Sequence, residues 1–348
     1  MGLAATIDIA EAPEAPALSQ PRDATTPLSR ICVGICTIRR PGMLKNCLES
    51  IGRQEGVEGC DVRVVVVEND TVPATKPVVD AFAATSPFPV HYINEPRRGI
   101  PFARNRVVDA ALAMAADHVA FVDDDQITHP TFLAKHIEAA ARDGADVVQA
   151  HIVPMFPTPR PFWATGRTGA VEIVDEDRPV SERKRRAAGT CGVMFSARLI
   201  RPDGMGLRFD ERIGLGRGSD SDFFSRASNG GMLIVNSRLP IVMDEIHRSR
   251  LTYWRHILGG LAQGNGHFVR YRNDNGYRAA FARYGAVSVV RFFRGIGQLA
   301  IAPLLAPFNL NGFKFSALEG GRNIFFAVGA IGGIFSLQYQ YYRNIDGY

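Results

Sequence analysis

The chain has 348 residues, of which 46% are hydrophobic and 22% are charged, and its net charge is +5. This composition excludes a disordered or fibrous protein, and the length allows one large domain or one domain with an appendage. The basic balance alone is compatible with nucleic acid, an anionic membrane or a phosphorylated substrate, so the position of the charges has to decide.

The N-terminal segment and the cysteines restrict the cellular setting. Residues 1–28 are rich in Ala, Pro and Thr and lack a basic region followed by an apolar run, so we expect a disordered tail and not a secretory signal. The chain has five cysteines, with no Cys-x-x-Cys pair and no zinc-type spacing. An odd number of cysteines without such motifs favours a reduced, cytoplasmic compartment.

Strands and helices are predicted to alternate from residue 30 to residue 153. Apolar runs predict strands and amphipathic patterns predict helices; in chain order they are 31–36, helix 41–54, 62–67, helix 74–84, 90–93, helix 101–116, 118–122, helix 130–142 and 147–153. This alternation predicts an α/β fold with a mixed, mostly parallel sheet flanked by helices. Polar clusters follow three strands, at 37–40, 68–70 and 123–125. Because ligands bind where parallel strands end, we expect these clusters to lie along one edge.

Three consecutive acids end the fourth predicted strand: Asp123, Asp124 and Asp125. Adjacent carboxylates repel one another unless a cation or a set of donors neutralises them. Mg²⁺ and Mn²⁺ prefer oxygen ligands and typically bind one or two carboxylates together with substrate phosphates. The cluster therefore indicates a metal and diphosphate site, and the alternative is a solvated acidic turn before the next helix.

A second acidic segment, 217–224, leads into a predicted helix. Ser219 or Asp220 is expected to be the N-cap of that helix, since Ser and Asp are favoured there. Asp220 is also a candidate catalytic base, because an attacking hydroxyl group needs a proton acceptor within hydrogen-bond reach. His247 follows a later apolar strand, where it serves either a structural role or as a further metal ligand.

The C-terminal region, 256–348, is basic and apolar. Nine arginines lie between residues 248 and 294 against a single acid, Asp274, and apolar stretches follow at 295–308 and 324–337. Each stretch is shorter than the ~20 residues that a spanning helix usually needs. We predict a helical region associated with an anionic membrane surface, and the alternative is an ordinary helical subdomain packed on the core. Trp254 is expected to stack on an acceptor sugar or to belong to the core.

Five segments in order resemble domains of glycosyltransferase family 2, which have the GT-A fold. They are 36–41, 65–70, 99–105, 121–125, and 209–211 with 218–224. The pattern is most similar to bacterial exopolysaccharide glucosyltransferases of the succinoglycan type. The resemblance runs from about residue 31 to residue 254, and it predicts a glycosyltransferase domain at 29–255.

The resemblance implies an inverting, metal-dependent hexosyltransferase of polysaccharide biosynthesis. It implies a nucleotide-sugar donor, a UDP-sugar, and a hydroxyl acceptor on a glycan or lipid-linked oligosaccharide at the cytoplasmic face of the inner membrane. By position in the motifs, Thr37, Arg39 and Glu68 would contact the uridine or its ribose. Arg104 would contact the nucleotide, Asp123 would lie near the ribose, and Asp125 would bind the Mg²⁺ or Mn²⁺. Asp220 would be the base, and His247 would bind metal or diphosphate. The other predicted substrate-binding residues are Asp70, Asp124, Ser219, Asp222 and Trp254.

Two departures from the family pattern concern the acceptor. Ser219 stands where the family usually has Glu, and Gly192 lies in a segment that often has Asn. A non-catalytic nucleotide-binding module at a membrane surface is the main alternative function. A dehydrogenase is disfavoured because 37–42 contains no Gly-x-Gly-x-x-Gly. Nucleic acid is not a predicted partner, since the basic residues lack an interleaved aromatic platform.

Overall fold

The computed structural model describes residues 29–157, 183–185, 188–337 and 339–340. The predicted N-terminal tail, 1–28, therefore lies outside the described residues. A nine-stranded sheet forms the centre of the molecule, with the order β3-β2-β1-β4-β8-β6-β9-β5 and with β7 paired to β9. Its strands are β1 (Arg30–Thr37), β2 (Asp61–Glu68), β3 (Val90–Asn94), β4 (His118–Asp123), β5 (Gln126–Thr128), β6 (Val147–Met155), β7 (Arg183–Arg185), β8 (Val193–Ser196) and β9 (Ile234–Glu245).

Eight α-helices accompany the sheet in the described part of the chain: α1 (Pro41–Ile51), α2 (Lys76–Ala83), α3 (Ile100–Ala113), α4 (Phe132–Asp143), α5 (Ser219–Asn229), α6 (Tyr253–Asn275), α7 (Tyr277–Leu305) and α8 (Leu310–Ile334). Proline stands in the first turn of α1, α2 and α3, where its missing N–H costs nothing. The strands and helices predicted between residues 30 and 153 are confirmed.

The first four strands of the sheet order, β3, β2, β1 and β4, are all parallel. In this register Thr37 lies opposite Glu68, and Cys36 lies opposite Asp123. The carboxyl ends of the strands are thus aligned, and the polar residues that follow them share one edge, as expected. The crossovers place helices on both faces, which is why the central residues of β1, β2 and β4 are apolar and buried.

The other half of the sheet is mixed. β8 is antiparallel to both β4 and β6, while β9 runs parallel to β6 and antiparallel to β5 and β7. This arrangement brings the end of β9 next to the end of β4, which adds a second source of polar side chains to the same edge.

Two buried layers hold the sheet and its helices together. On one face, α1, α2 and α4 pack against side chains of β1 and β2 such as Val33 and Val64. On the other face, α3 and α5 bury an aromatic group that includes Phe121, Phe209 and Phe223. The rings of Phe209 and Phe223 stack with centroids 4.3 Å apart, so the segment before α5 is fixed to the core.

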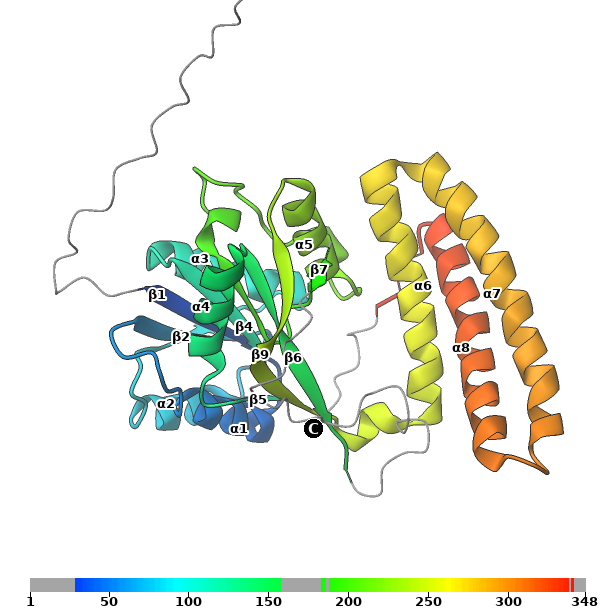
Figure 1. Cartoon of the computed structure of the whole chain (residues 1–348), viewed down its shortest axis with the longest axis horizontal. Helices are drawn as coiled ribbons and strands as arrows, with labels where there is room; N and C mark the ends of the chain where they lie inside the picture. Colours follow the sequence, from blue (N-terminus) through cyan, green and yellow to red (C-terminus); the bar gives the residue numbers. More distant parts are fainter. Residues whose placement is uncertain (1–28, 158–182, 186–187, 338, 341–348) are drawn as a thin grey trace, which may run out of the picture.

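The helices α6, α7 and α8 form a separate layer beside the sheet domain (Figure 1). They pack closely through glycines: a Cβ at Gly264 would lie 2.0 Å from the carbonyl oxygen of Phe326, and one at Gly329 would lie 2.0 Å from that of Leu261. The predicted helical C-terminal region is present, and its first helix begins at Tyr253, three residues before the predicted boundary.

The two apolar stretches of this region are parts of longer helices. Residues 295–308 include the end of α7, and 324–337 include the end of α8. Among the described helices, α7 alone is long and apolar enough to cross a membrane, and only 17% of its most apolar window is buried. α7 as a whole is therefore long enough to span a membrane, although the apolar stretch within it is shorter than a spanning helix usually is.

Candidate active site

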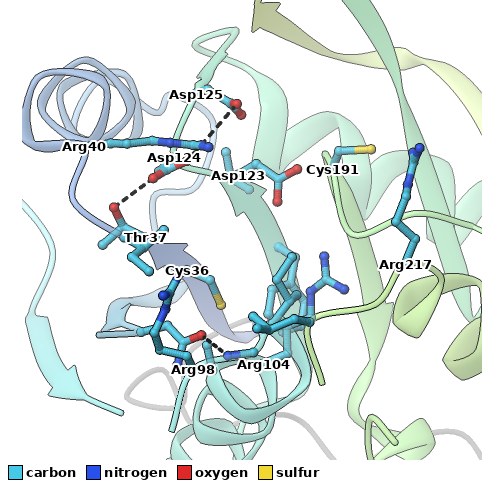
Figure 2. Close-up of a pocket in the computed structure, with 18 of the residues that line it drawn as sticks. Cys36, Thr37, Arg40, Arg98, Arg104, Asp123, Asp124, Asp125, Cys191 and Arg217 are labelled. Carbon is cyan, nitrogen blue, oxygen red and sulfur yellow. Dashed lines mark hydrogen bonds and ion pairs between the residues drawn. The ribbon is translucent and has the colours of Figure 1, made fainter. Parts of the chain in front are cut away.

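A cavity of about 320 Å³ opens at the carboxyl ends of β1 and β4. It brings together five of the residues predicted from the sequence: Thr37, Arg104, Asp123, Asp124 and Asp125. Figure 2 shows the three acids on one side of the cavity and Arg104 on another. The predicted convergence of the first and fourth strand ends on one pocket is therefore confirmed.

The chain neutralises part of the acidic cluster itself. Thr37 Oγ1 donates a hydrogen bond of 2.8 Å to Asp124, and Arg40 Nη1 donates one of 2.9 Å to the other oxygen of Asp124. The same Arg40 nitrogen lies 3.5 Å from Asp125 Oδ2. These contacts, visible in Figure 2, hold the turn after β4 against the start of α1. The positive charge of Arg40 therefore offsets part of the negative charge of two neighbouring carboxylates.

Asp123 remains the acid with the least compensation. Burial raises its pKa to about 7, and the charge of Asp125 adds to this effect, whereas Arg104 opposes it. Burial also raises the pKa of Asp124, against the lowering effect of Arg40. A cation that enters the cavity would favour the ionised form of these groups.

Arg104 is held rigidly in the cavity wall by α3. Its Nη1 donates to Ser219 Oγ over 2.7 Å, and its Nη2 donates to Thr190 Oγ1. The guanidinium also lies 5.5 Å from the ring centroid of Phe209. These contacts connect α3 with the start of α5 and leave Arg104 fixed near the acidic cluster, where a diphosphate would need a positive charge.

The donor set suits a hard divalent cation. Four carboxylates line the cavity, Asp123, Asp124 and Asp125 from the end of β4 and Asp244 from β9. Within the described part of the chain, no group of three or more His, Cys, Asp or Glu side chains forms a ready metal cage. A metal that binds one or two carboxylates and a substrate diphosphate needs no such cage, so the residues fit this kind of site.

Asp220 lies at the boundary with a second cavity of about 410 Å³, between α5 and α6. Arg217 and Arg255 line both cavities, so the two adjoin. Cys191 lines the first cavity, and burial followed by the charges of Asp123 and Asp220 raises its pKa. Asp220 therefore lines a cavity that adjoins the one containing the acidic cluster.

The start of α5 differs from the sequence prediction in one respect. Its N-cap is Gly218, with φ 103°, and neither Ser219 nor Asp220 caps the helix. Only glycine adopts this φ readily. As a consequence, the Ser219 hydroxyl accepts a hydrogen bond from Arg104, and Asp220 is placed in the first turn, where the helix dipole favours a carboxylate.

Three predicted substrate-binding residues do not line the cavity. Glu68 is fully buried and accepts hydrogen bonds from Thr75 and Tyr92, so it holds the loop after β2. Arg39 forms an ion pair with the buried Asp70. These contacts shape the rim of the site, and direct contacts of Glu68, Arg39 and Asp70 with a nucleotide stay predictions.

The remaining predicted residues lie around the second cavity or beyond it. Asp222 is engaged with Arg226 one turn later in α5, at 2.8 Å. His247 accepts a hydrogen bond from Ser249 N and caps a short turn. Trp254 is 58% exposed, so its assignment to the core is wrong. Their roles toward metal or substrate remain untested predictions.

Sequence reasoning missed five charged residues that line the cavity: Arg40, Arg98, Arg217, Asp244 and Arg255. Asp244 had a detectable signal, because it follows an apolar strand as Asp123 does. Arg217 and Arg255 had none, since their approach depends on how α5 and α6 dock. Gly192, one of the two departures from the family, has φ +65°, and a Cβ there would lie 2.6 Å from Val242, so the backbone requires glycine.

The fold is that of GT-A proteins. The mannosyltransferase PcManGT of Pyrobaculum calidifontis, solved in complex with GDP-Man and Mn²⁺, superposes with a TM-score of 0.57 at 15% identity, over 89% of this chain and 88% of that one. A structure of S. aureus TarS in complex with UDP gives a TM-score of 0.46 at 13% identity, over 91% and 95% of the two chains.

Residues 32–201 match the model of the family described as Glycosyl transferase family 2. The succinoglycan biosynthesis protein ExoM of Rhizobium meliloti is 29% identical over 224 residues, which cover 63% of this chain and 68% of that protein. These matches confirm the resemblance to family 2 and to exopolysaccharide biosynthesis proteins that the motifs indicate.

Proposed function

We propose that the protein is an inverting glycosyltransferase that moves a sugar from a nucleotide-sugar donor to a hydroxyl of a glycan or lipid-linked acceptor. The observation that carries this proposal is that the cavity lined by Asp123, Asp124 and Asp125 adjoins the cavity lined by Asp220, with Arg217 and Arg255 lining both. The relatives support the donor class, since the Pyrobaculum mannosyltransferase was solved with GDP-Man and Mn²⁺. For this chain we favour a UDP-sugar, on the motif resemblance.

In this proposal, the first cavity binds the donor and the metal ion. We assign Asp125 as the ligand of a Mg²⁺ or Mn²⁺ ion, with Asp123 near the ribose and Arg104 beside the diphosphate. A divalent ion bound there would neutralise the diphosphate and so stabilise the charge that develops on the leaving group. Arg104, already fixed by Ser219 and Thr190, contributes preorganised positive charge without having to move.

In this proposal, Asp220 is the base that accepts the proton of the acceptor hydroxyl. The acceptor hydroxyl loses its proton to Asp220 while its oxygen bonds to the anomeric carbon. The bond from that carbon to the donor phosphate breaks, and its electrons leave with the nucleoside diphosphate. Attack from the side opposite the leaving group inverts the anomeric configuration. The position of Asp220, in the cavity that adjoins the acidic cluster, supports this single displacement.

We further propose that α6, α7 and α8 attach the enzyme to the anionic cytoplasmic leaflet. Large apolar side chains point outward from α7 and the following turn: Leu304 is 70% exposed, Phe293 65% and Phe308 90%. Close helix contacts at Gly264 and Gly329 are of the kind that membrane helices use. The arginines beside these apolar faces suit anionic headgroups.

A screen of nucleotide sugars tests the proposed activity. The purified protein is incubated with each donor and Mn²⁺, and the released nucleoside diphosphate is measured. We expect hydrolysis of one donor, most readily a UDP-sugar, that stops when the metal is chelated. Release of no nucleotide from any donor in the presence of metal and membrane extract would favour the alternative, a non-catalytic nucleotide-binding module at the membrane surface.

A further inference from the structure

The second cavity has a cationic lining that the donor site does not account for. Its lining contains four arginines, and among the described residues Asp220 is its one carboxylate; the arginines are Arg217, Arg255, Arg270 and Arg322. Arg270 and Arg322 line this cavity and not the first one. Arg270 and Arg322 therefore contribute positive charge to the cavity that the proposed base, Asp220, also lines.

The face of α6 toward α5 keeps this space open. Gly259, Ala262 and Gly266 follow one another at intervals of three and four residues, so they lie on one side of the helix. A Cβ at Gly259 would meet nothing within 4 Å, and one at Gly266 would lie 3.2 Å from the carbonyl oxygen of Arg217. Arg255 and Arg270 continue the same face at either end, one turn beyond the small residues. The helix thus presents a small-residue floor between two arginines.

The charges around the cavity leave a positive excess. Glu319 lies next to the lining and is shared by Arg322, at 3.4 Å, and His256, at 3.6 Å. His267 also lines the cavity; burial lowers its pKa to about 4, and the charges of Arg270, Arg291 and Arg217 add to this effect. An uncharged His267 adds nothing to the excess. A multiply charged anion would relieve the repulsion among the arginines, whose planar donors match phosphate oxygens.

We propose that the second cavity binds a phosphate or diphosphate group of the acceptor, with Arg270 and Arg322 as its ligands and the acceptor hydroxyl directed at Asp220. This inference rests on the proposed function, because it assigns the acceptor of that reaction to a chemical class. The shared chemistry is a phosphoryl group close to the accepting sugar. It can come from a lipid-linked sugar diphosphate or from a soluble sugar phosphate.

The first test measures anion binding without donor or metal. Inorganic pyrophosphate is titrated into the full chain in EDTA, with calorimetric detection. We expect binding that Arg270→Gln weakens about tenfold or more, since a charge-assisted hydrogen bond to phosphate is lost. Arg270→Lys should fall between the two, because it keeps the charge and loses the planar fork. The matched control is Arg278→Gln, which removes one exposed arginine of α7.

The fold of the variants is checked by their melting temperatures. Arg270 interacts with the charge of Asp274 one turn later in α6. A single pair of this kind on a helix contributes only about 0.2–0.5 kcal/mol, so replacement of Arg270 should change the melting temperature little. Absence of pyrophosphate binding to the intact protein would overturn the proposal. So would binding that Arg270→Gln leaves unchanged, because the anion would then lie in the donor cavity. Neither result depends on donor hydrolysis, which tests the enzyme activity separately.

The second test separates the two sources of phosphate. Phosphatidylcholine vesicles with and without polyprenyl diphosphate are sedimented with the intact protein and with Arg270→Gln. Diphosphate-dependent retention that the variant loses assigns the cavity to a lipid-linked acceptor. Loss of pyrophosphate binding without any effect on retention assigns it to a soluble sugar phosphate.

Discussion

The sheet domain and the layer formed by α6, α7 and α8 bury opposite kinds of groups. In the sheet domain, charged side chains such as Glu68 and Asp124 are buried and hydrogen-bonded, and they arrange a pocket. In the helical layer, glycines are buried at helix contacts while Phe293 and Phe308 face outward. Buried, hydrogen-bonded charges position the side chains of a site in a domain that is surrounded by water. Outward apolar side chains suit a region that is in contact with an apolar environment. The contrast predicts that substitutions in the two regions disturb different properties.

The largest effect is expected at Asp220. Asp220→Asn should lower the transfer rate by roughly 10²–10⁴-fold, the usual cost of removing a positioned base, while donor binding survives. Steady-state transfer and donor affinity are measured together, and Asp80→Asn, which changes an exposed acid of α2 paired with Lys76, is the control. Loss of donor binding in Asp220→Asn would show that the carboxylate has another role.

A stability effect is expected at His136, in the core of the sheet domain. Burial lowers the pKa of this histidine from 6.5 to about 4, so the unfolded chain takes up the proton first as the pH falls. Stability should be fully present above pH 6.5 and decrease by about 3 kcal/mol as the pH falls toward 4. Urea unfolding of the intact protein and of His136→Gln measures this, and the variant should lose that part of the pH dependence. Equal slopes in the two proteins would contradict the assignment.

The helical layer should respond to the size of its buried small residues. Gly264→Ala places a Cβ 2.0 Å from the Phe326 carbonyl, so we expect a loss of about 1–3 kcal/mol in the free energy of unfolding. Gly285→Ala in α7 meets nothing within 4 Å and should gain up to about 1 kcal/mol from helix propensity. Chemical denaturation in detergent compares the two. If both substitutions have the same sign, the close contact of α6 and α8 is not present.

The mildest effect is expected for outward apolar groups. Phe293 on α7 and Val72 in the sheet domain are both 65% exposed. Phe293→Asp should weaken sedimentation with phosphatidylglycerol vesicles by about tenfold, the effect of one lost apolar anchor, whereas Val72→Asp should not change it. Donor hydrolysis in solution should be the same for both variants. Equal vesicle binding by both variants would remove the basis for membrane attachment.

Much of the sheet domain could be predicted because its signals are local. Apolar runs between 31 and 153 predict the strands, and an acid after such a run marks the edge where ligands bind. This signal predicts Asp123, Asp124 and Asp125 at the cavity, as observed, whereas the role of Asp220 stays a prediction. The motif residues Asn69 and Asn105 prove to hold loops: Asn69 bonds to Gly99 and Asn105 to Phe209.

The rest depends on how distant segments dock. The spacing of Arg255 and Arg270 puts them on one face of α6, but Arg217 and Arg322 reach the same cavity only because α6 lies beside α8 and the segment before α5, and no sequence spacing expresses that arrangement. The N-cap of α5 was assigned by side-chain preference, but the turn geometry at Gly218 decided otherwise. The length of α7 was underestimated because arginines interrupt its apolar pattern.

A crystal structure with Mn²⁺ and a nucleoside diphosphate tests the central claim most directly. The account predicts an anomalous manganese peak within about 2.0–2.2 Å of a carboxylate oxygen of Asp125, with the diphosphate between the ion and Arg104 and with Asp220 across the pocket. Manganese bound away from the end of β4, or a diphosphate that leaves the cavity between β1 and β4 empty, would contradict it.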